Sequence, residues 1–257
     1  ATKEAAFNYA LVTAGIVQVM ARNCMKGDLP SCHCSRAKRP QSLAAKYKWG
    51  GCGDNIQYAS DFSRTFLNDP QVEKLNGSAN TKRAEKLLTD NHNKEVGRQA
   101  VLKNRRIICK CHGATSHCTA QTCWYQVQEF NVIGDYLKAK YSSAAKVNLF
   151  RRKDGKKVAL KDNRNNLFKN KLRLVYTENS PHYCTKASQS YYYSAGALGR
   201  PCNATTTGPG SCNQLCCGRG HKTERRIVSK NCRCKFRWCC DVKCDQCQEE
   251  IRVHTCK

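Results

Sequence analysis

Four cysteines lie within fifteen residues, at Cys109, Cys111, Cys118 and Cys123. Only six residues separate the inner two, which is too few for a helix. Pairing the inner two inside the outer two closes a ladder of antiparallel strands. The interval between them contains glycine and hydroxyl side chains, which are typical of turns. The spacing therefore predicts a doubly cross-linked β-hairpin that displays Thr115 and Ser116 on a rigid tip.

The same hairpin could be interpreted as the active site of a secreted hydrolase, with His112 as a base beside Cys111 or Ser116. A nucleophilic cysteine has to be free, whereas the even cysteine count and the nested spacing indicate that none is. The hairpin also lacks a carboxylate that could orient a histidine. We therefore expect no enzymatic activity and interpret His112 as a structural turn residue.

The chain has twenty cysteines in 257 residues, an even number that is typical of an oxidised, secreted protein with ten disulfides. A zinc-binding basic regulatory protein is the alternative, because residues 232–234 and 244–247 have ligand-like C-x-C and C-x-x-C spacing. Against zinc, the adjacent cysteine pairs at 216–217 and 239–240 suit tetrahedral coordination poorly. Thiol titration and chelation distinguish the two hypotheses.

Two N-glycosylation sequons, at Asn76 and Asn203, support the secretory pathway. We expect a protein of the extracellular space and extracellular matrix. The chain starts without a charged segment followed by a short apolar one, so we expect that a signal peptide is removed or not included. Residues 5–21 are apolar but shorter than the roughly 20 residues that span a membrane. They predict a buried helix.

Lysine and arginine outnumber aspartate and glutamate by 45 to 19, for a net charge of +26. Such an excess attracts polyanions through its summed field, and outside the cell these are sulfated glycans such as heparan sulfate. Nucleic acid is not expected, because neither stacked aromatics nor a helix-turn-helix pattern accompanies the charge.

The cysteines divide the chain, since eight precede residue 150 and twelve follow residue 183. Helical patterns cover residues 4–23, 56–67, 81–88 and 94–103, and a further helix is possible at 124–140. Cationic residues at about 150–175 predict an exposed linker or a strand pair. We expect an amino-terminal domain at 1–175, with its hairpin at about 105–125, and a carboxy-terminal domain at 176–257 that depends on cross-links.

Cys234 and Cys244 enclose nine residues and predict a second cross-linked hairpin. Its tip carries the apolar residues Phe236, Trp238 and Val242. Two interpretations are open for the aromatic pair: packing against the cystine framework, or a binding hot spot. Aromatic side chains on a rigid loop lose little conformational entropy on docking, which favours the hot spot.

The 109–124 run resembles the acylated hairpin of the Wnt family of secreted morphogens. Further segments are similar to motifs of that family and together extend the resemblance over nearly the whole chain: residues 4–7, 49–55, 62–64, 93–98, 180–184 and 216–221. The carboxy-terminal cysteine spacing is also similar throughout. The family usually has a further cysteine pair upstream, so we expect that an amino-terminal stretch is missing.

The resemblance implies a disulfide pairing that uses every cysteine. By position, the pairs are Cys24–Cys32, Cys34–Cys52, Cys109–Cys123, Cys111–Cys118, Cys184–Cys217, Cys202–Cys212, Cys216–Cys256, Cys232–Cys247, Cys234–Cys244 and Cys239–Cys240. The implied fold class is α+β and disulfide-rich. It joins a helical amino-terminal domain with a stapled β-hairpin thumb to a small cystine-knit carboxy-terminal domain with a β-hairpin finger.

The resemblance also implies a ligand that grips the cysteine-rich domain of a Frizzled receptor with thumb and finger. The implied receptor-binding residues are His112, Gly113, Thr115, Ser116, Phe236, Trp238, Cys239, Cys240 and Val242. Low-density-lipoprotein-receptor-related co-receptors, a membrane acyltransferase and a Wnt carrier are the other implied partners. No metal or cofactor is implied, apart from N-glycans and a covalent monounsaturated fatty acyl group.

The acyl acceptor departs from the family pattern. Thr115 stands where the family has its lipid-bearing serine, and Ser116-His117 replaces the Gly-Ser that follows. Three outcomes are open: acylation of Thr115, acylation of Ser116 instead, or secretion without lipid. Retention of the rest of the hairpin favours Thr115.

Overall fold

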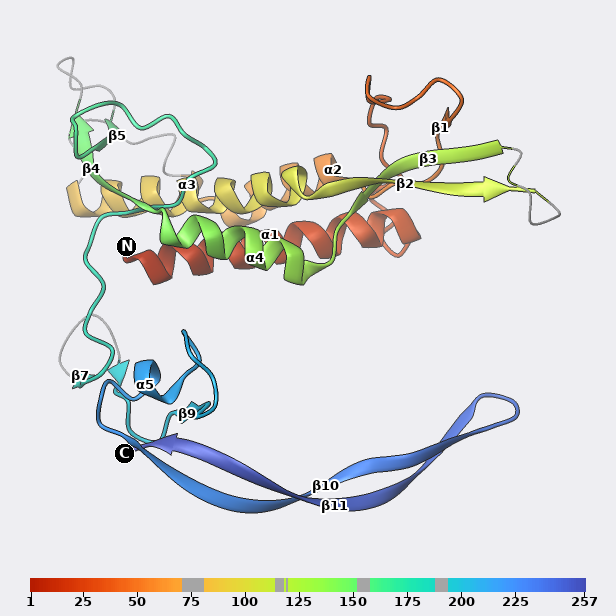
Figure 1. Cartoon of the computed structure of the whole chain (residues 1–257). Helices are drawn as coiled ribbons and strands as arrows, with labels where there is room; N and C mark the ends of the chain where they lie inside the picture. Colours follow the sequence, from red (N-terminus) through yellow and green to blue (C-terminus); the bar gives the residue numbers. More distant parts are fainter. Residues whose placement is uncertain (71–80, 114–117, 119, 152–157, 188–193) are drawn as a thin grey trace. The chain divides into compact units, whose positions relative to one another are not determined.

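The computed structural model describes residues 1–70, 81–113, 118, 120–151, 158–187 and 194–257 (Figure 1). By contacts the chain divides into two compact units, Ala1–Ser180 and Pro181–Lys257. The disulfide-rich α+β class that we expected is confirmed.

The first unit is built on four helices: α1 (Lys3–Lys26), α2 (Ile56–Leu67), α3 (Thr81–Lys103) and α4 (Phe130–Ser142). Helix α1 packs against the other three and has eight buried residues. It is the one described helix long and apolar enough to cross a membrane by length and composition, a test that the core helix of a globular protein also passes. Its buried residues agree with the buried helix expected from the sequence.

Two helix predictions were wrong in part. The patterns at 81–88 and 94–103 belong to one continuous helix, α3. The residues between them are polar but paired: Thr89 donates to the Glu85 carbonyl (2.7 Å), and the Asn93 amide donates to the Val175 carbonyl (2.9 Å). The other helix begins only at Phe130, because the residues up to Val127 pair as a strand.

Two small sheets complete the first unit. Strands β1 (Lys48–Trp49), β3 (Ala120–Val127) and β2 (Arg105–His112) form one, in that order. Strands β5 (Val158–Asp162), β4 (Ala145–Arg151) and β6 (Val175–Tyr176) form the other. The cationic region at about 150–175, expected as a linker or strand pair, therefore contains β5 and the end of its partner strand β4.

The second unit is dominated by a long two-stranded ribbon of β10 (His221–Arg237) and β11 (Asp241–Cys256). Strand β9 (Pro201–Cys202) pairs with the end of β11, and α5 (Cys212–Leu215) follows it. Strands β7 (Lys186–Ala187) and β8 (Ser194–Ala195) form a separate pair. The buried cluster of this unit consists of Cys212, Cys216 and Cys256, so sulfur takes the place of an aliphatic core.

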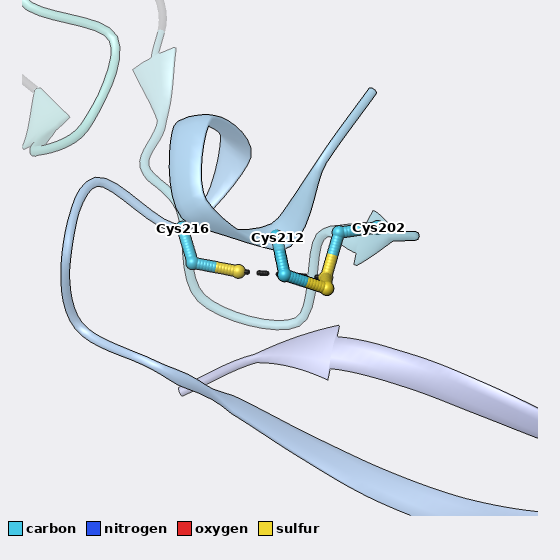
Figure 2. Close-up of side chains that lie close together, drawn as sticks. All are labelled: Cys202, Cys212 and Cys216. Carbon is cyan, nitrogen blue, oxygen red and sulfur yellow. Dashed lines mark hydrogen bonds between the residues drawn. A yellow bond between two sulfur atoms is a disulfide. The ribbon is translucent and has the colours of Figure 1, made fainter. Parts of the chain in front are cut away.

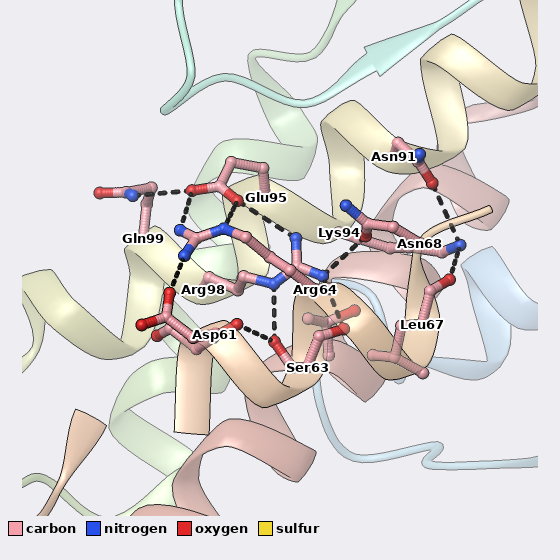
Figure 3. A network of polar contacts seen from close by, with 12 residues as sticks. Asp61, Ser63, Arg64, Leu67, Asn68, Asn91, Lys94, Glu95, Arg98 and Gln99 are labelled. Carbon is pink, nitrogen blue, oxygen red and sulfur yellow. Dashed lines mark hydrogen bonds and ion pairs between the residues drawn. The ribbon is translucent and has the colours of Figure 1, made fainter. Parts of the chain in front are cut away.

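A partly buried ionic network joins α2 to α3 (Figure 3). Arg98, with its side chain 1% exposed, donates to the Ser63 hydroxyl (2.7 Å) and to a Glu95 carboxylate oxygen (3.1 Å). Arg64 donates to both Glu95 oxygens (3.1 and 3.2 Å). Burial alone would raise the pKa of Glu95, but hydrogen bonds from Arg64 and Gln99 and the two arginine charges outweigh it and lower that pKa. The network therefore keeps Glu95 ionised and the two helices in register.

Helices α1 and α3 meet backbone to backbone at Gly97. A Cβ on Gly97 would lie 2.2 Å from the Ala10 carbonyl oxygen, so we expect Gly97→Ala to cost about 1–3 kcal/mol of stability through overpacking. Gly134 in α4 has no atom within 4 Å of such a Cβ, so Gly134→Ala should stabilise by about 0.5–1 kcal/mol. Chemical unfolding followed by helical circular dichroism, without reductant, measures both. Equal effects of the two variants would contradict the close approach.

Candidate functional site

The thumb hairpin, β2 and β3, is cross-linked as the cysteine spacing predicts. Cys109–Cys123 joins directly opposite residues, and Cys111–Cys118 lies beyond it toward the tip. The Gln121 amide donates to both sulfurs of the Cys111–Cys118 cystine, at 3.3 Å and 3.2 Å. The stem is therefore held by two covalent bonds and a side-chain contact across its width.

The segment at 49–55 anchors the base of the thumb to the helical core. Trp49 packs edge-on against Tyr125, with ring centroids 5.0 Å apart, and a Cβ on Gly53 would lie 2.7 Å from the Tyr125 carbonyl oxygen. The buried Asp54 carboxylate accepts the Val127 N–H (2.7 Å). Burial raises the pKa of Asp54, although the Val127 hydrogen bond and the Arg22 charge oppose that change. Close backbone approach and a buried acceptor thus set the position from which the thumb projects.

The tip of the thumb lies partly outside the described residues, and both acyl-acceptor candidates, Thr115 and Ser116, belong to that part. His112 ends β2, and its Nε2 lies 2.8 Å from the Thr122 hydroxyl on the facing strand. Gly113 follows and is exposed. His112 is therefore a strand residue tied across the hairpin, whereas we had expected a turn residue.

The finger hairpin is the β10–β11 ribbon, cross-linked by Cys232–Cys247 and Cys234–Cys244. At its tip, Phe236 is 69% exposed, Trp238 95% and Val242 56%. Phe236 stands directly opposite Val242. The packing of these aromatics against the cystine framework, one of two sequence interpretations, is absent in the described finger. Three large apolar side chains face solvent together on a cross-linked scaffold.

One expected disulfide is wrong: Cys239 and Cys240 are exposed free thiols with their sulfurs 4.0 Å apart. The two residues are adjacent, so a disulfide between them would have to close across a single peptide bond, with Cα atoms about 3.8 Å apart. Both residues also adopt positive φ, 72° and 87°, in the turn between Arg237 and Asp241. The nine other expected pairs are all present.

Three cysteine sulfurs gather in the second unit with the spacing of a metal site, at Cys202, Cys212 and Cys216 (Figure 2). Their chemistry does not fit a metal, because Cys202 is bonded to Cys212 and Cys216 to Cys256, and zinc binds thiolates. The cluster is two cystines in contact, with 3.6 Å between the sulfurs of Cys216 and Cys202. The two remaining thiols, at Cys239 and Cys240, are too few for a zinc site made of four cysteines.

Sequence reasoning missed two features. One is a cavity of about 590 Å³ at the base of the thumb, lined among others by Arg36, Tyr58 and Tyr125; the described tip residues of the two hairpins do not line it. The other is the basic character of the finger tip, where Lys235 and Lys243 stand directly opposite each other. Alternation of lysine with Phe236 and Val242 along the two strands was the available signal for it.

The cysteine state gives a direct test. The native protein should react with two equivalents of maleimide, at Cys239 and Cys240, because these are exposed and unbonded. Denaturation without reductant should release no further thiols, and a chelator should leave the fold unchanged. Peptide mapping of the labelled, non-reduced protein assigns the sites. Finding no thiols would restore the vicinal disulfide, whereas four or more would contradict the pairing described above.

Comparison with known proteins agrees with this geometry. Residues 1–257 match the model of the wnt family. The chain is 41% identical to Protein Wnt-5b of Ambystoma mexicanum, covering 100% of this chain and 70% of that protein. It is 40% identical to Protein Wnt-5a of Homo sapiens, covering 100% and 66%. A solved structure, human WLS in complex with WNT8A, matches with a TM-score of 0.67 and 34% identity, covering 100% of this chain and 78% of that one.

The chain spans about two thirds of the length of these curated relatives. The matching family model covers every residue, and the helical unit, thumb and cystine-linked finger all fall within the match. This chain belongs to the Wnt family, whose members are secreted signalling ligands and not enzymes.

Proposed function

We propose that this chain is a signalling ligand that binds the cysteine-rich domain of Frizzled receptors through the tips of its thumb and finger. The observation that carries the proposal is the finger tip, where Phe236, Trp238 and Val242 are exposed on a doubly cross-linked ribbon. Exposed aromatics on a rigid support can bury apolar area without much loss of side-chain freedom. Cys239 and Cys240 complete the contact surface of this tip.

The thumb supplies the second contact, with His112 and Gly113 leading to an acylated Thr115. A buried acyl chain contributes about 0.8 kcal/mol per CH₂, so it can dominate the affinity of this site. Two cystines in the described stem support this role, because they hold the arm straight when the lipid is pulled into an apolar groove. Ser116 is the alternative acceptor.

The remaining partners follow from the lipid and the charge. A membrane acyltransferase would attach the chain, a carrier such as the WLS of the matched complex would shield it, and low-density-lipoprotein-receptor-related proteins would act as co-receptors. The net charge of +26 favours retention by heparan sulfate in the extracellular matrix. Asn203 is exposed, and its side-chain oxygen accepts both the Thr205 N–H (2.9 Å) and hydroxyl (2.7 Å), an accessible arrangement for N-glycosylation. Asn76, the other sequon, lies outside the described residues.

Trp238→Ala tests the finger. Because hot-spot aromatics contribute roughly 2 kcal/mol or more, we expect about a 30-fold rise in the Kd for a soluble Frizzled cysteine-rich domain. Ile227→Ala is the matched control, since Ile227 is 70% exposed on the same ribbon away from its tip; it should leave the Kd unchanged. A normal Kd for a Trp238→Ala protein with all nine disulfides intact would refute the finger assignment.

Mass spectrometry of the secreted protein tests the thumb. The non-reduced peptide that contains Cys111–Cys118 should carry the mass of one monounsaturated fatty acyl group. Thr115→Val should remove that mass, because it deletes the hydroxyl and keeps the shape, and Ser116→Ala should not. If the acyl mass is lost only in Ser116→Ala, the acyl acceptor is Ser116 and not Thr115. An unmodified peptide in the wild-type protein would leave receptor binding to the finger.

A further inference from the structure

The charges of the finger hairpin are divided along its length. Three ion pairs neutralise the part nearer its base: Arg225–Glu250 (3.4 Å), Arg226–Glu224 (3.1 Å) and Lys230–Glu249. Beyond the bulge between Cys232 and Lys235 the pattern changes. Among the described residues, no carboxylate lies within ion-pair distance of Lys235, Arg237 or Lys243, although Asp241 stands opposite Arg237. The tip is therefore cationic, whereas the base is balanced.

The register separates the tip into two faces. Directly opposite residues of an antiparallel pair share a face, and successive residues alternate between faces. Phe236 opposite Val242 therefore defines an apolar face. Lys235 and Lys243, which stand opposite each other, lie on the second face. Arg237 lies on that face too, because it is two residues from Lys235 on the same strand. We call these three residues the basic face of the finger.

Two ammonium groups directly opposite on a ribbon repel each other and destabilise the pairing. A two-stranded hairpin has little stability of its own to offset this, and both lysines are exposed to solvent. Asp241, the carboxylate on the same face, stands opposite Arg237, and among the described residues no carboxylate lies within ion-pair distance of either lysine. Anionic groups brought against this face from outside would relieve the repulsion at both lysines together.

We propose that the basic face, Lys235, Arg237 and Lys243, docks against carboxylates of the same protein partner that takes the apolar face. The proposal rests on the proposed function, since it assigns to the finger a second contact with its receptor. A protein partner is favoured over a sulfated glycan because Trp238, 95% exposed, shares this rigid tip. An apolar centre beside a charged rim is the anatomy of protein interfaces.

The role of the basic face is selection. Complementary charge accelerates encounter, and like charge rejects the wrong partner, while neither adds much affinity to a well-packed contact. The basic face therefore favours receptors whose finger-binding surface carries carboxylates next to its apolar pocket, and disfavours receptors with lysine or arginine there.

Lys243→Glu is the sharpest test, because it separates folding from docking. A carboxylate at position 243 faces Lys235 across the strands, so the hairpin should be as stable as the wild type or more so. The charge of the face nevertheless falls by two. The association rate is measured for a set of soluble Frizzled cysteine-rich domains. For the domain that the wild type binds most rapidly, we expect Lys243→Glu to lower that rate by about tenfold at low salt. The difference between the variant and the wild type should shrink as salt rises.

The control is Lys222→Glu, which makes the same charge change near the base of the same hairpin, opposite Thr255. Because position 222 lies away from the contact, the association rate of this variant should stay within about twofold of the wild type. An unchanged rate for Lys243→Glu, while Trp238→Ala still weakens binding, would overturn the basic face and keep the finger. If neither Lys243→Glu nor Trp238→Ala alters receptor binding, the proposed function is overturned as well. Weaker heparin retention with unaltered receptor binding would assign the face to glycans and also overturn the proposal.

Discussion

Cross-strand cystines are the constraint on which both hairpins depend. A ribbon of two strands exposes both faces and cannot bury enough apolar area to hold itself together. Most residues of β10 and β11 are exposed, and the buried cluster of the same unit is made of cysteine. Each cystine contributes typically 2–4 kcal/mol through the entropy of the unfolded chain. Covalent bonds thus replace a core and leave apolar side chains such as Trp238 free to face solvent.

The thumb is also a cross-linked two-stranded hairpin, and it is in addition attached to the helical core of its unit. Its base is fastened to a conventional helical core by the segment at 49–55, where Gly53 allows two backbones to touch and Asp54 accepts the Val127 N–H. Burial raises the pKa of Asp54, so the fold destabilises the ionised carboxylate relative to the unfolded chain. The end of β3 is therefore held at an electrostatic cost, at the base of the thumb.

Much of this architecture could be predicted from local signals. Nested cysteine spacing predicts both hairpins, and the pattern of α2 predicts its bounds, because neither depends on distant partners. The failures share a cause in tertiary context. Polar residues such as Asn93 suggest a break in α3, yet they are buried and paired with Val175, which is far away in sequence.

The other incorrect or missing predictions also depend on tertiary structure, mainly on which strands pair. Trp124, Tyr125 and Val127 are of types that strands favour, and their strand is fixed by pairing with β2, where Ile108 stands opposite Trp124. The adjacent thiols of Cys239 and Cys240 depend on the backbone of a three-residue turn, which spacing alone does not fix. That Lys235 and Lys243 lie opposite each other follows from the register of β10 and β11, which the sequence alone does not give.

The two proposed contacts differ in the information that they can carry. An acyl chain is recognised by apolar burial, which is non-directional and roughly proportional to area, so any groove of sufficient length accepts it. Affinity from the thumb therefore comes with little power to choose between receptors. Charge and shape on a rigid finger are directional, and a mismatch there leaves a charge unpaired or a pocket unfilled. Discrimination between receptors thus has to reside in the protein surface of the finger, where three cations beside Phe236 and Trp238 have no carboxylate within ion-pair distance among the described residues.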